Sequence, residues 1–173
     1  MNIWQILRSI PSFSIFSDQE LKIISEQAET RDFASGEFVL REGQSNERMY
    51  VIMHGTVEIH KKYDDKDFVV AELSVGNFIG EVSILGFDEK PMASVIAKTN
   101  TSLLEISKEV VARWSEENPK IVIKLFQVIS LGLSRKLRKL NEEYVKIFMQ
   151  TKGLGKISEL RSLQEKLFKE WGI

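Results

Sequence analysis

The sequence contains no cysteine, and this absence excludes several kinds of chemistry at once. Without cysteine there can be no disulfide framework, no thiolate metal site and no thiol nucleophile. Histidine is nearly as scarce: His54 and His60 stand alone, six residues apart, and no cluster of acidic residues accompanies them. We therefore expect no metal site and no Ser–His–Asp catalysis, because each needs several such groups in suitable spacing. The sequence predicts a protein that is not an enzyme.

Long apolar runs are missing as well. No run approaches the roughly 20 residues that a membrane-spanning helix needs. The start of the chain, MNIWQILRSIP, lacks the charged-then-apolar profile of a signal peptide. The 173 residues, of which 28% are charged and 43% hydrophobic, suit one domain with helical extensions. We therefore expect a cytoplasmic protein.

The two parts of the chain differ in charge, although the net charge is only −1. Residues 1–117 carry a net charge of −8 and residues 118–173 a net charge of +7. A basic tail favours contact with something acidic, such as the front part of a second copy, or is simply a solvated helix face. The run Arg135–Lys139 alternates with leucine, which is typical of an amphipathic helix with a basic outer face.

The first thirty residues predict helices. Residues 2–16 form an apolar segment that Pro11 interrupts. Ser17 and Glu20 have the spacing of a capping box, in which each side chain accepts from the other residue's backbone N–H. We expect a helix to follow and to end near Arg31.

From Phe33 the hydrophobic pattern changes to a period of two, which predicts strands. His54-Gly55 between two apolar runs has the form of a two-residue hairpin turn. Short strands at close spacing are typical of a small antiparallel barrel or jelly roll. The expected strands cover residues 38–40, 49–53, 56–60, 68–73, 93–97 and 102–106.

After Ser107 the helical period returns. A short helix is expected to end near Asn118, and Pro119 is well placed to begin a long helix that continues to about Gln150. A final amphipathic helix follows over residues 155–171. The predicted fold class is α+β: an antiparallel β jelly-roll barrel with N-terminal helices, a long C-terminal helix and the final amphipathic helix. The corresponding domains are 1–117, 118–150 and 151–173.

The second half of the long helix carries a heptad seam, interrupted at Ser130. Such a seam fits a two-helix interface or a helix that packs on its own barrel, and we favour a homodimer. The final amphipathic helix could bury its apolar stripe on its own barrel, on a second copy or on a different protein. The seam consists of Phe126, Leu133, Leu137, Leu140, Tyr144 and Ile147.

The stretch of residues 76–97 is the most informative. Gly80 can take a positive φ or approach a ligand closely, and the carboxylate of Glu81 follows at once. The backbone of Val82 and Ser83 lies at the start of a predicted helical turn, where an anion is favoured. A carboxylate beside an anion site suits a ligand with hydroxyls and a phosphate, although a plain glycine turn explains the same residues.

The flanks of this turn carry a resemblance. Gly76-Asn77-Phe78-Ile79-Gly80-Glu81-Val82-Ser83-Ile84, followed by a loop and Ala93-Ser94-Val95, resembles the phosphate-binding cassette of the cyclic-nucleotide-binding domain family. That cassette reads G-x-x-F-G-E-x-A-L, a loop, then R-S/T-A-T/S-V. The family includes bacterial catabolite activators and kinase regulatory subunits, and the glycine spacing extends the resemblance over about 70 residues.

The resemblance implies a role for each matching residue. Gly80 and Glu81 would contact the ribose, and Val82, Ser83 and Ser94 would lie near the phosphate or the base. Glu81 could equally cap a neighbouring turn. The implied ligand is cAMP or cGMP, acting as a regulator rather than as a cofactor.

One position departs from the family pattern. The family's arginine, which neutralises the cyclic phosphate, falls on Pro91 or, with a slip of one residue, on Met92. Lys90 offers only a point charge. Two interpretations follow: a ligand-sensing regulatory module, or a degenerate domain that binds no nucleotide and serves as a dimerisation scaffold. Relatives that bind DNA carry a further helix-turn-helix module, and the 23 residues beyond Gln150 leave no room for one, so we do not expect DNA binding.

Overall fold

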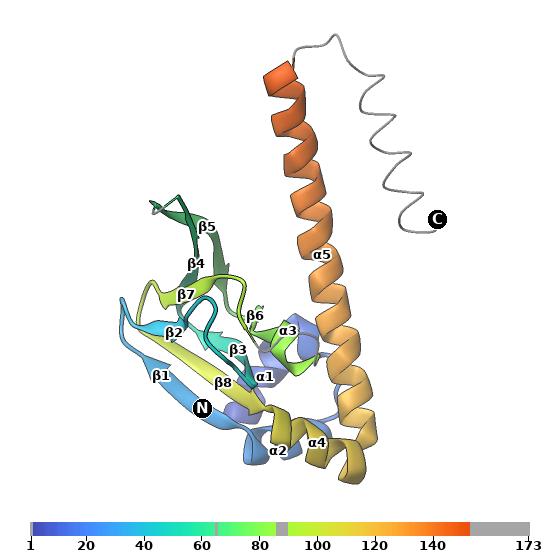
Figure 1. Ribbon diagram of the computed structural model, residues 1–173. Coiled ribbons are helices and arrows are strands. Elements are labelled where there is room, and N and C mark those ends of the chain that lie inside the picture. The colour runs from blue at the N-terminus through green and yellow to red at the C-terminus, as the bar shows by residue number, and fades with distance from the viewer. Residues whose placement is uncertain (1, 65, 86–89, 153–173) are drawn as a thin grey trace. The chain divides into compact units, whose positions relative to one another are not determined.

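The computed structural model describes residues 2–64, 66–85 and 90–152, with residues 148–152 described by their backbone alone (Figure 1). The chain divides into two compact units, residues 1–132 and residues 133–173. Every strand of the described residues belongs to the first unit. The described part of the second unit is helical. The domain bounds expected at residues 118 and 151 stay a prediction.

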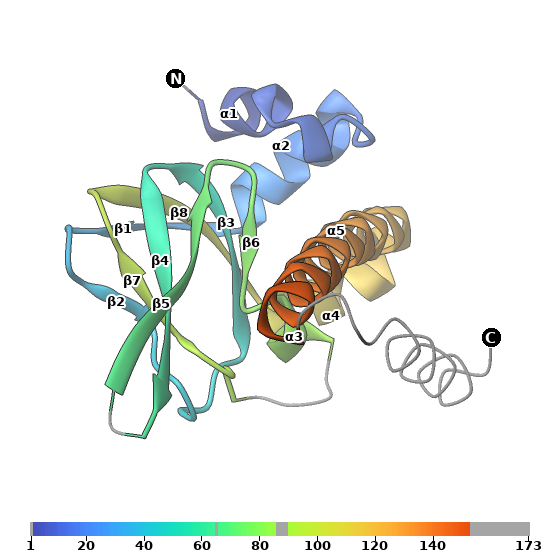
Figure 2. The same ribbon diagram turned by 90° about the horizontal axis from the view of Figure 1, so that it is seen from above.

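In the described residues, eight strands form two four-stranded antiparallel sheets, which face each other in Figures 1 and 2. The strand order is β1-β8-β3-β6 in one sheet and β2-β7-β4-β5 in the other. The prediction of a jelly roll is confirmed, but the two sheets stay separate instead of closing into one barrel. The strands are β1 (Glu29–Phe33), β2 (Phe38–Leu40), β3 (Arg48–His54), β4 (Thr56–Tyr63), β5 (Lys66–Ser74), β6 (Phe78–Ile79), β7 (Ser94–Ala97) and β8 (Thr101–Ser107).

The core between the sheets consists of apolar residues from both of them. Tyr50 and Ile52 of β3 are two residues apart, so their side chains lie on the same face. Removing such apolar side chains from water is the main favourable term in folding. The buried cluster is Val39, Leu40, Tyr50, Ile52, Val57, Ile79, Val95 and Leu103.

A second apolar region joins the helices of the first unit to the sheets. Phe13 lies between Phe16 and Phe78, with ring centroids 5.4 and 5.9 Å away. The fully buried Trp114 donates from Nε1 to Gln27 Oε1 at 2.6 Å. The helical elements are α1 (Ile3–Ser9), η1 (Pro11–Phe13), α2 (Asp18–Gln27), α3 (Glu81–Ile84), α4 (Lys108–Glu117) and α5 (Pro119–Lys152). The ring contact joins the N-terminal helical segment to β6, and the hydrogen bond joins α4 to α2.

The capping box at the start of α2 is confirmed. The backbone N–H of Glu20 donates to Ser17 Oγ at 3.2 Å, and the N–H of Ser17 donates to Glu20 Oε2 at 2.7 Å. Lys124 of α5 also donates to Glu20 Oε2, at 2.6 Å. Burial opposes the charge of Glu20, but the bonds from Lys124 and Ser17 outweigh it and lower the pKa of this carboxyl below 4.5.

Two sequence-based expectations are wrong. Helix α2 ends at Gln27 rather than near Arg31, and strand β1 begins at Glu29. His54-Gly55 is not a hairpin turn, because β3 and β4 belong to different sheets. Gly55, with φ of +84°, instead carries the chain from one sheet to the other. A Cβ there would lie 2.6 Å from the carbonyl oxygen of Asn100, so the corner requires glycine.

The long C-terminal helix is confirmed. Pro119 is the first residue of α5, as expected of a proline whose missing N–H has no intrahelical partner in any case. Its first three turns bury Ile121, Leu125 and Ile129 in the first unit. In the second unit, Leu137 is 56% exposed and Leu140 is 70% exposed. The amphipathic helix expected over residues 155–171 lies outside the described residues.

Candidate functional site

The turn between β6 and α3 holds the first part of the candidate site. Gly80 has φ of +71°, in the left-handed region. A Cβ at this position would lie 2.7 Å from the carbonyl oxygen of Arg48, 3.1 Å from Asn46 Nδ2 and 3.4 Å from Leu40 Cδ1. Both the backbone conformation and the close approach of other residues therefore require glycine here.

Glu81 and Ser83 follow on the single turn of α3 and point into the molecule. Glu81 is only 7% exposed and Ser83 only 2% exposed. Ser83 Oγ accepts from Asn46 Nδ2 at 3.2 Å, and the backbone N–H of Ser83 donates to the carbonyl oxygen of Gly80 at 3.1 Å. Val82, between them, is half-buried. A carboxylate held this far from solvent beside a glycine turn is a suitable acceptor for the hydroxyls of a ligand.

The second part of the site lies around the start of β7. Ser94 Oγ accepts from the backbone N–H of Glu42 at 3.0 Å, and the carbonyl oxygen of Pro91 accepts from the N–H of Gly43 at 3.0 Å. The carbonyl oxygen of Met92 accepts from Lys61 Nζ at 2.6 Å. Lys90 is exposed. Of the residues singled out from the sequence, Pro91 and Ser94 are therefore held by the segment that follows β2.

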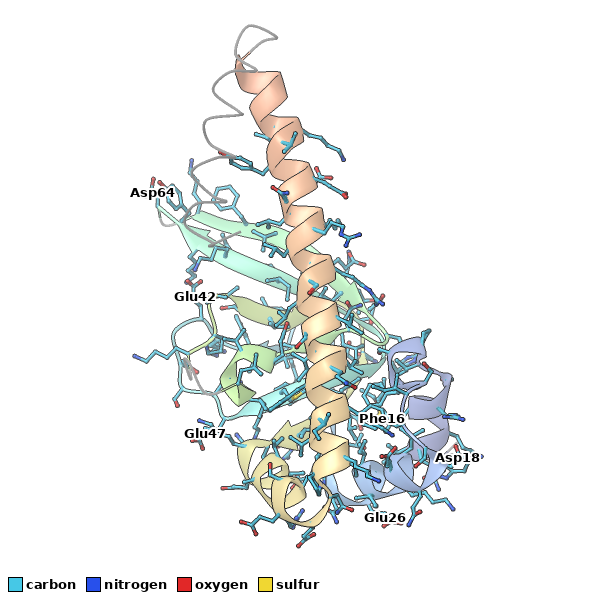
Figure 3. All side chains as sticks on the ribbon, turned by 90° about the vertical axis from the view of Figure 1, so that its right-hand side faces the viewer. Phe16, Asp18, Glu26, Glu42, Glu47 and Asp64 are labelled. Carbon is cyan, nitrogen blue, oxygen red and sulfur yellow. The ribbon has the colours of Figure 1, made fainter. Side chains whose placement is uncertain are left out.

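That segment, the loop of residues 41–47 between β2 and β3, is the part of the site that sequence reasoning missed. It contacts the β7 side through Glu42 and Gly43, and the α3 side through Asn46. Glu42, near the start of this loop, and Glu47, at its end, are labelled in Figure 3. A glycine pattern alone could not show that this loop bridges both parts of the site.

A pocket of about 240 Å³ opens beside the loop. Arg41 lies over the ring of Phe38, 3.6 Å from its centroid. Arg48 Nε donates to Glu105 Oε1 at 2.9 Å. The lining residues are Phe38, Val39, Leu40, Arg41, Gln44, Ser45, Asn46, Arg48, Tyr50 and Pro91.

Two ionisable groups in and beside the pocket, Tyr50 and Glu42, have shifted pKa values. Burial, aided by the charge and hydrogen bond of Glu105, raises the pKa of Tyr50 to about 12, so this phenol stays neutral. The hydrogen bond from Lys61 lowers the pKa of Glu42 against the opposing effect of burial. Glu42 is therefore ionised and paired with Lys61.

Comparison with known proteins decides the family. Residues 30–118, just over half of the chain, match the model described as the cyclic nucleotide-binding domain. The chain belongs to the cyclic nucleotide-binding domain family. The matched residues cover all eight strands of the described residues, except for Glu29 at the start of β1. They also cover both parts of the candidate site.

Two curated proteins illustrate the relatives of this cyclic nucleotide-binding domain. One is a protein of Rhodopseudomonas palustris whose name describes a potassium channel, 30% identical over 134 residues, which cover 78% of this chain and 32% of that one. Another is the CRP-like cAMP-activated global transcriptional regulator of Mycobacterium tuberculosis, 26% identical over 139 residues, which cover 79% and 59%. The chain thus spans a third to three fifths of these two proteins.

Solved structures show the same fold. A cyclic nucleotide-binding domain from Methylobacillus flagellatus superposes with a TM-score of 0.73 at 23% identity, covering 88% of this chain and 84% of that one. The regulatory subunit of a cAMP-independent protein kinase A from Trypanosoma brucei gives a TM-score of 0.61 at 25% identity, covering 79% and 49%. A variant of that subunit with three substitutions, one of them threonine to arginine, was solved bound to cAMP.

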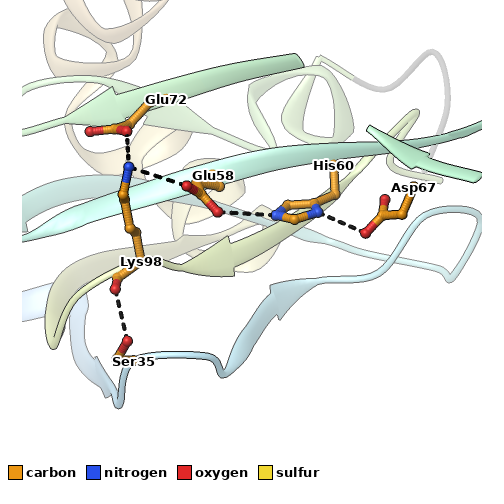
Figure 4. A network of polar contacts seen from close by, with 6 residues as sticks. All are labelled: Ser35, Glu58, His60, Asp67, Glu72 and Lys98. Carbon is orange, nitrogen blue, oxygen red and sulfur yellow. Dashed lines mark hydrogen bonds and ion pairs between the residues drawn. The ribbon is translucent and has the colours of Figure 1, made fainter. Parts of the chain in front are cut away.

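The cyclic nucleotide-binding domain also carries a polar network on the sheet that contains β4 (Figure 4). His60 contacts Asp67 at 2.9 Å and Glu58 at 3.4 Å, while Lys98 pairs with both Glu58 and Glu72. The hydrogen bond from Lys98 lowers the pKa of Glu58. Within residues 2–64, 66–85 and 90–152, no group of His, Asp and Glu is arranged to hold a metal ion.

None of the helices in the described part of the chain combines the length and the apolar character that crossing a bilayer demands.

Proposed function

We propose that this chain is a non-catalytic regulatory module that senses a small ligand of the cyclic nucleotide class. The observation that supports it most is the turn at Gly80, where a left-handed glycine packed against Arg48 is followed by the buried carboxylate of Glu81. A glycine in this conformation lets the backbone approach a ligand closely, and the carboxylate beside it can accept hydrogen bonds from ligand hydroxyls. Cytoplasmic location belongs to the same proposal.

The proposed ligand contacts are those that the resemblance implies. Gly80 and Glu81 would bind the ribose, while Val82, Ser83 and Ser94 would face the phosphate or the base. Ser83 and Ser94 support this arrangement because the loop of residues 41–47 joins them through Asn46 and Glu42. In a sensing module, ligand binding changes the equilibrium between two arrangements of the C-terminal helices.

Affinity for a cyclic nucleotide is proposed to be low. In this chain Lys90, Pro91 and Met92 stand where the family has its phosphate-binding arginine. A charge-assisted contact contributes about 1.5–3 kcal/mol, or about one to two decades of affinity. The cAMP-independent subunit from Trypanosoma brucei supports this view, because its cAMP-bound variant carries an added arginine.

Titration calorimetry with cAMP and cGMP tests the proposal. We expect micromolar binding by the wild-type protein, loss of binding in Glu81→Ala, and unchanged binding in Glu116→Ala. Glu116 is a matched control because it is an exposed glutamate on α4. Equal affinity in both variants, or no heat with either nucleotide, would contradict the proposal. Thermal melts of both variants separate a lost contact from a lost fold.

A second candidate is a degenerate domain that acts as a homodimerisation scaffold through the C-terminal helix. The exposure of Leu137 and Leu140 in the second unit favours it, because apolar residues at heptad spacing suit a helix–helix interface. The proposed seam also contains Phe126, Leu133, Tyr144 and Ile147. A dimer that binds neither nucleotide would support this candidate over the first.

A further inference from the structure

The pocket beside the loop of residues 41–47 has a strongly one-sided charge. Its ten lining residues include two arginines and no acidic residue. Gln44, Ser45 and Asn46 add polar groups to the same wall. A concave site with cationic and amide groups and no carboxylate in its wall favours an anionic ligand.

Arg41 supplies a cation that the protein itself does not neutralise. Its guanidinium stacks on Phe38 and makes no ion pair with any described residue. This stacking leaves the edge of the guanidinium, where the N–H donors lie, open to hydrogen bonding. The position of Arg41 is therefore fixed by Phe38, while its charge is not paired with an acidic side chain of the described residues.

Arg48 is the second cationic residue that lines the pocket. It shares Glu105 with Arg31, each contacting a different oxygen, so that a single negative charge is divided between two guanidinium groups. Arg31 has a second partner in Glu29, at 2.9 Å. Arg48 is thus held in place by Glu105 and only partly neutralised.

The loop is fixed before any ligand arrives. Gly43 bonds to Pro91 and Asn46 bonds to Ser83, and the turn closes on itself through the N–H of Gln44 donating to the carbonyl oxygen of Arg41 at 3.2 Å. The neighbouring Glu42 lies outside the pocket wall and is neutralised by Lys61. A pocket of this kind binds with less loss of conformational entropy than a mobile loop.

The pocket and the Gly80 turn have neighbouring residues in common. Three of the pocket's lining residues, Leu40, Asn46 and Arg48, are the same residues that approach Gly80 most closely. Pro91, at the position of the family's arginine, lines the pocket as well. The pocket therefore borders both parts of the candidate site.

We propose that the pocket binds the phosphoryl group of the ligand, with Arg41 and Arg48 supplying the positive charge that Pro91 cannot. A guanidinium presents paired donors that match phosphate geometry, as a lysine does not. The volume of about 240 Å³ is below the roughly 300–1,000 Å³ of drug-sized ligand sites, so it suits a phosphoryl group with a small organic part. This inference deepens the proposed function and rests on it for the rest of the ligand.

The test uses inorganic phosphate as the probe and the full chain as the protein. Phosphate is titrated while the backbone amides of residues 44–46 are followed by two-dimensional NMR. We expect saturable shifts at these amides and an affinity about tenfold lower or more in Arg41→Gln. Arg41→Lys, which keeps the charge but loses the paired donors, should fall between. Arg113→Gln, which removes an exposed arginine from α4, should bind as the wild type does.

Two results would overturn the inference: no saturable shift at residues 44–46, or equal affinity in Arg41→Gln and Arg113→Gln. A nucleotide arm keeps the two proposals apart. If cAMP binds and depends on Glu81 but is indifferent to Arg41 and to added phosphate, the pocket inference fails while the proposed function stands. If phosphate binding depends on Arg41 although cAMP does not bind, the pocket is a phosphate site and the nucleotide proposal fails.

Discussion

Replacing Gly80 with alanine would place a methyl group 2.7 Å from the carbonyl oxygen of Arg48. An L-residue in the left-handed region costs about 1–2 kcal/mol. Part of this cost is offset because an unfolded chain with alanine has less conformational entropy to lose on folding than one with glycine. The clash adds about 1–3 kcal/mol, the usual cost of overpacking, because the nearest atom belongs to the backbone and not to a flexible side chain. We therefore expect Gly80→Ala to lower the free energy of unfolding by about 2–4 kcal/mol.

Gly43→Ala is the matched control. Gly43 has φ of +73°, almost the same as the +71° of Gly80, but a Cβ there would meet nothing within 4 Å. Its cost should be the conformational term alone, about 1 kcal/mol. The difference between the two variants, measured by urea denaturation with unchanged m-values, therefore isolates the clash.

Equal destabilisation in the two variants would refute this reasoning. It would mean that β3 can move away from Gly80 without penalty, and that the close approach of Arg48 to this turn does not constrain the site. A thermal melt gives the same comparison, since each kcal/mol corresponds to about 2–4 °C in a chain of this size.

Three further predictions concern the ligand, the assembly and the pH dependence. Pro91→Arg should strengthen binding of cAMP or cGMP by about tenfold or more in calorimetry, and the absence of any gain would show that the pocket differs elsewhere. Leu137→Asp combined with Leu140→Asp should yield a monomer by light scattering, whereas Leu131→Asp, outside the heptad seam, should not; an unchanged mass in the double variant would argue against the seam. Glu20 has a lowered pKa, so its stabilising effect is present above pH 4.5 and is lost as the pH falls through its folded-state pKa. When the urea midpoint of unfolding is plotted against pH, we therefore expect it to fall less steeply at acidic pH in Glu20→Gln than in the wild type. Parallel curves for the two proteins would count against this role of Glu20.

The elements that could be predicted from the sequence are those fixed by neighbours along the chain. The capping box of Ser17 and Glu20 needs only a spacing of three residues, and the structure has both of its bonds. Pro119 begins a helix for an equally local reason. Strand β1 was missed because Glu29–Phe33 is polar and exposed along most of its length, so it reads as the continuation of α2.

Features that depend on distant residues could not be predicted in this way. The pattern around His54-Gly55 is that of a hairpin, yet whether β3 pairs with β4 depends on β8 and β7, which occupy the places beside them. The pocket could not be predicted from the sequence for the same reason. Nothing in the local sequence of Arg41 or Arg48 indicates that both line one pocket with Pro91, which is 50 and 43 residues further along the chain.

The pairing of the strands also has a consequence for the time course of folding. Among the strand pairs of the described residues, only β4 and β5 follow each other directly in sequence. Glu29 pairs with Glu105, so β1 cannot complete its pairing until β8 has been synthesised. At about 5–20 residues per second, a ribosome needs roughly 4–15 s to cover that interval. Folding dominated by such distant pairings is slow, and during this interval the nascent chain exposes unpaired strand edges that promote aggregation.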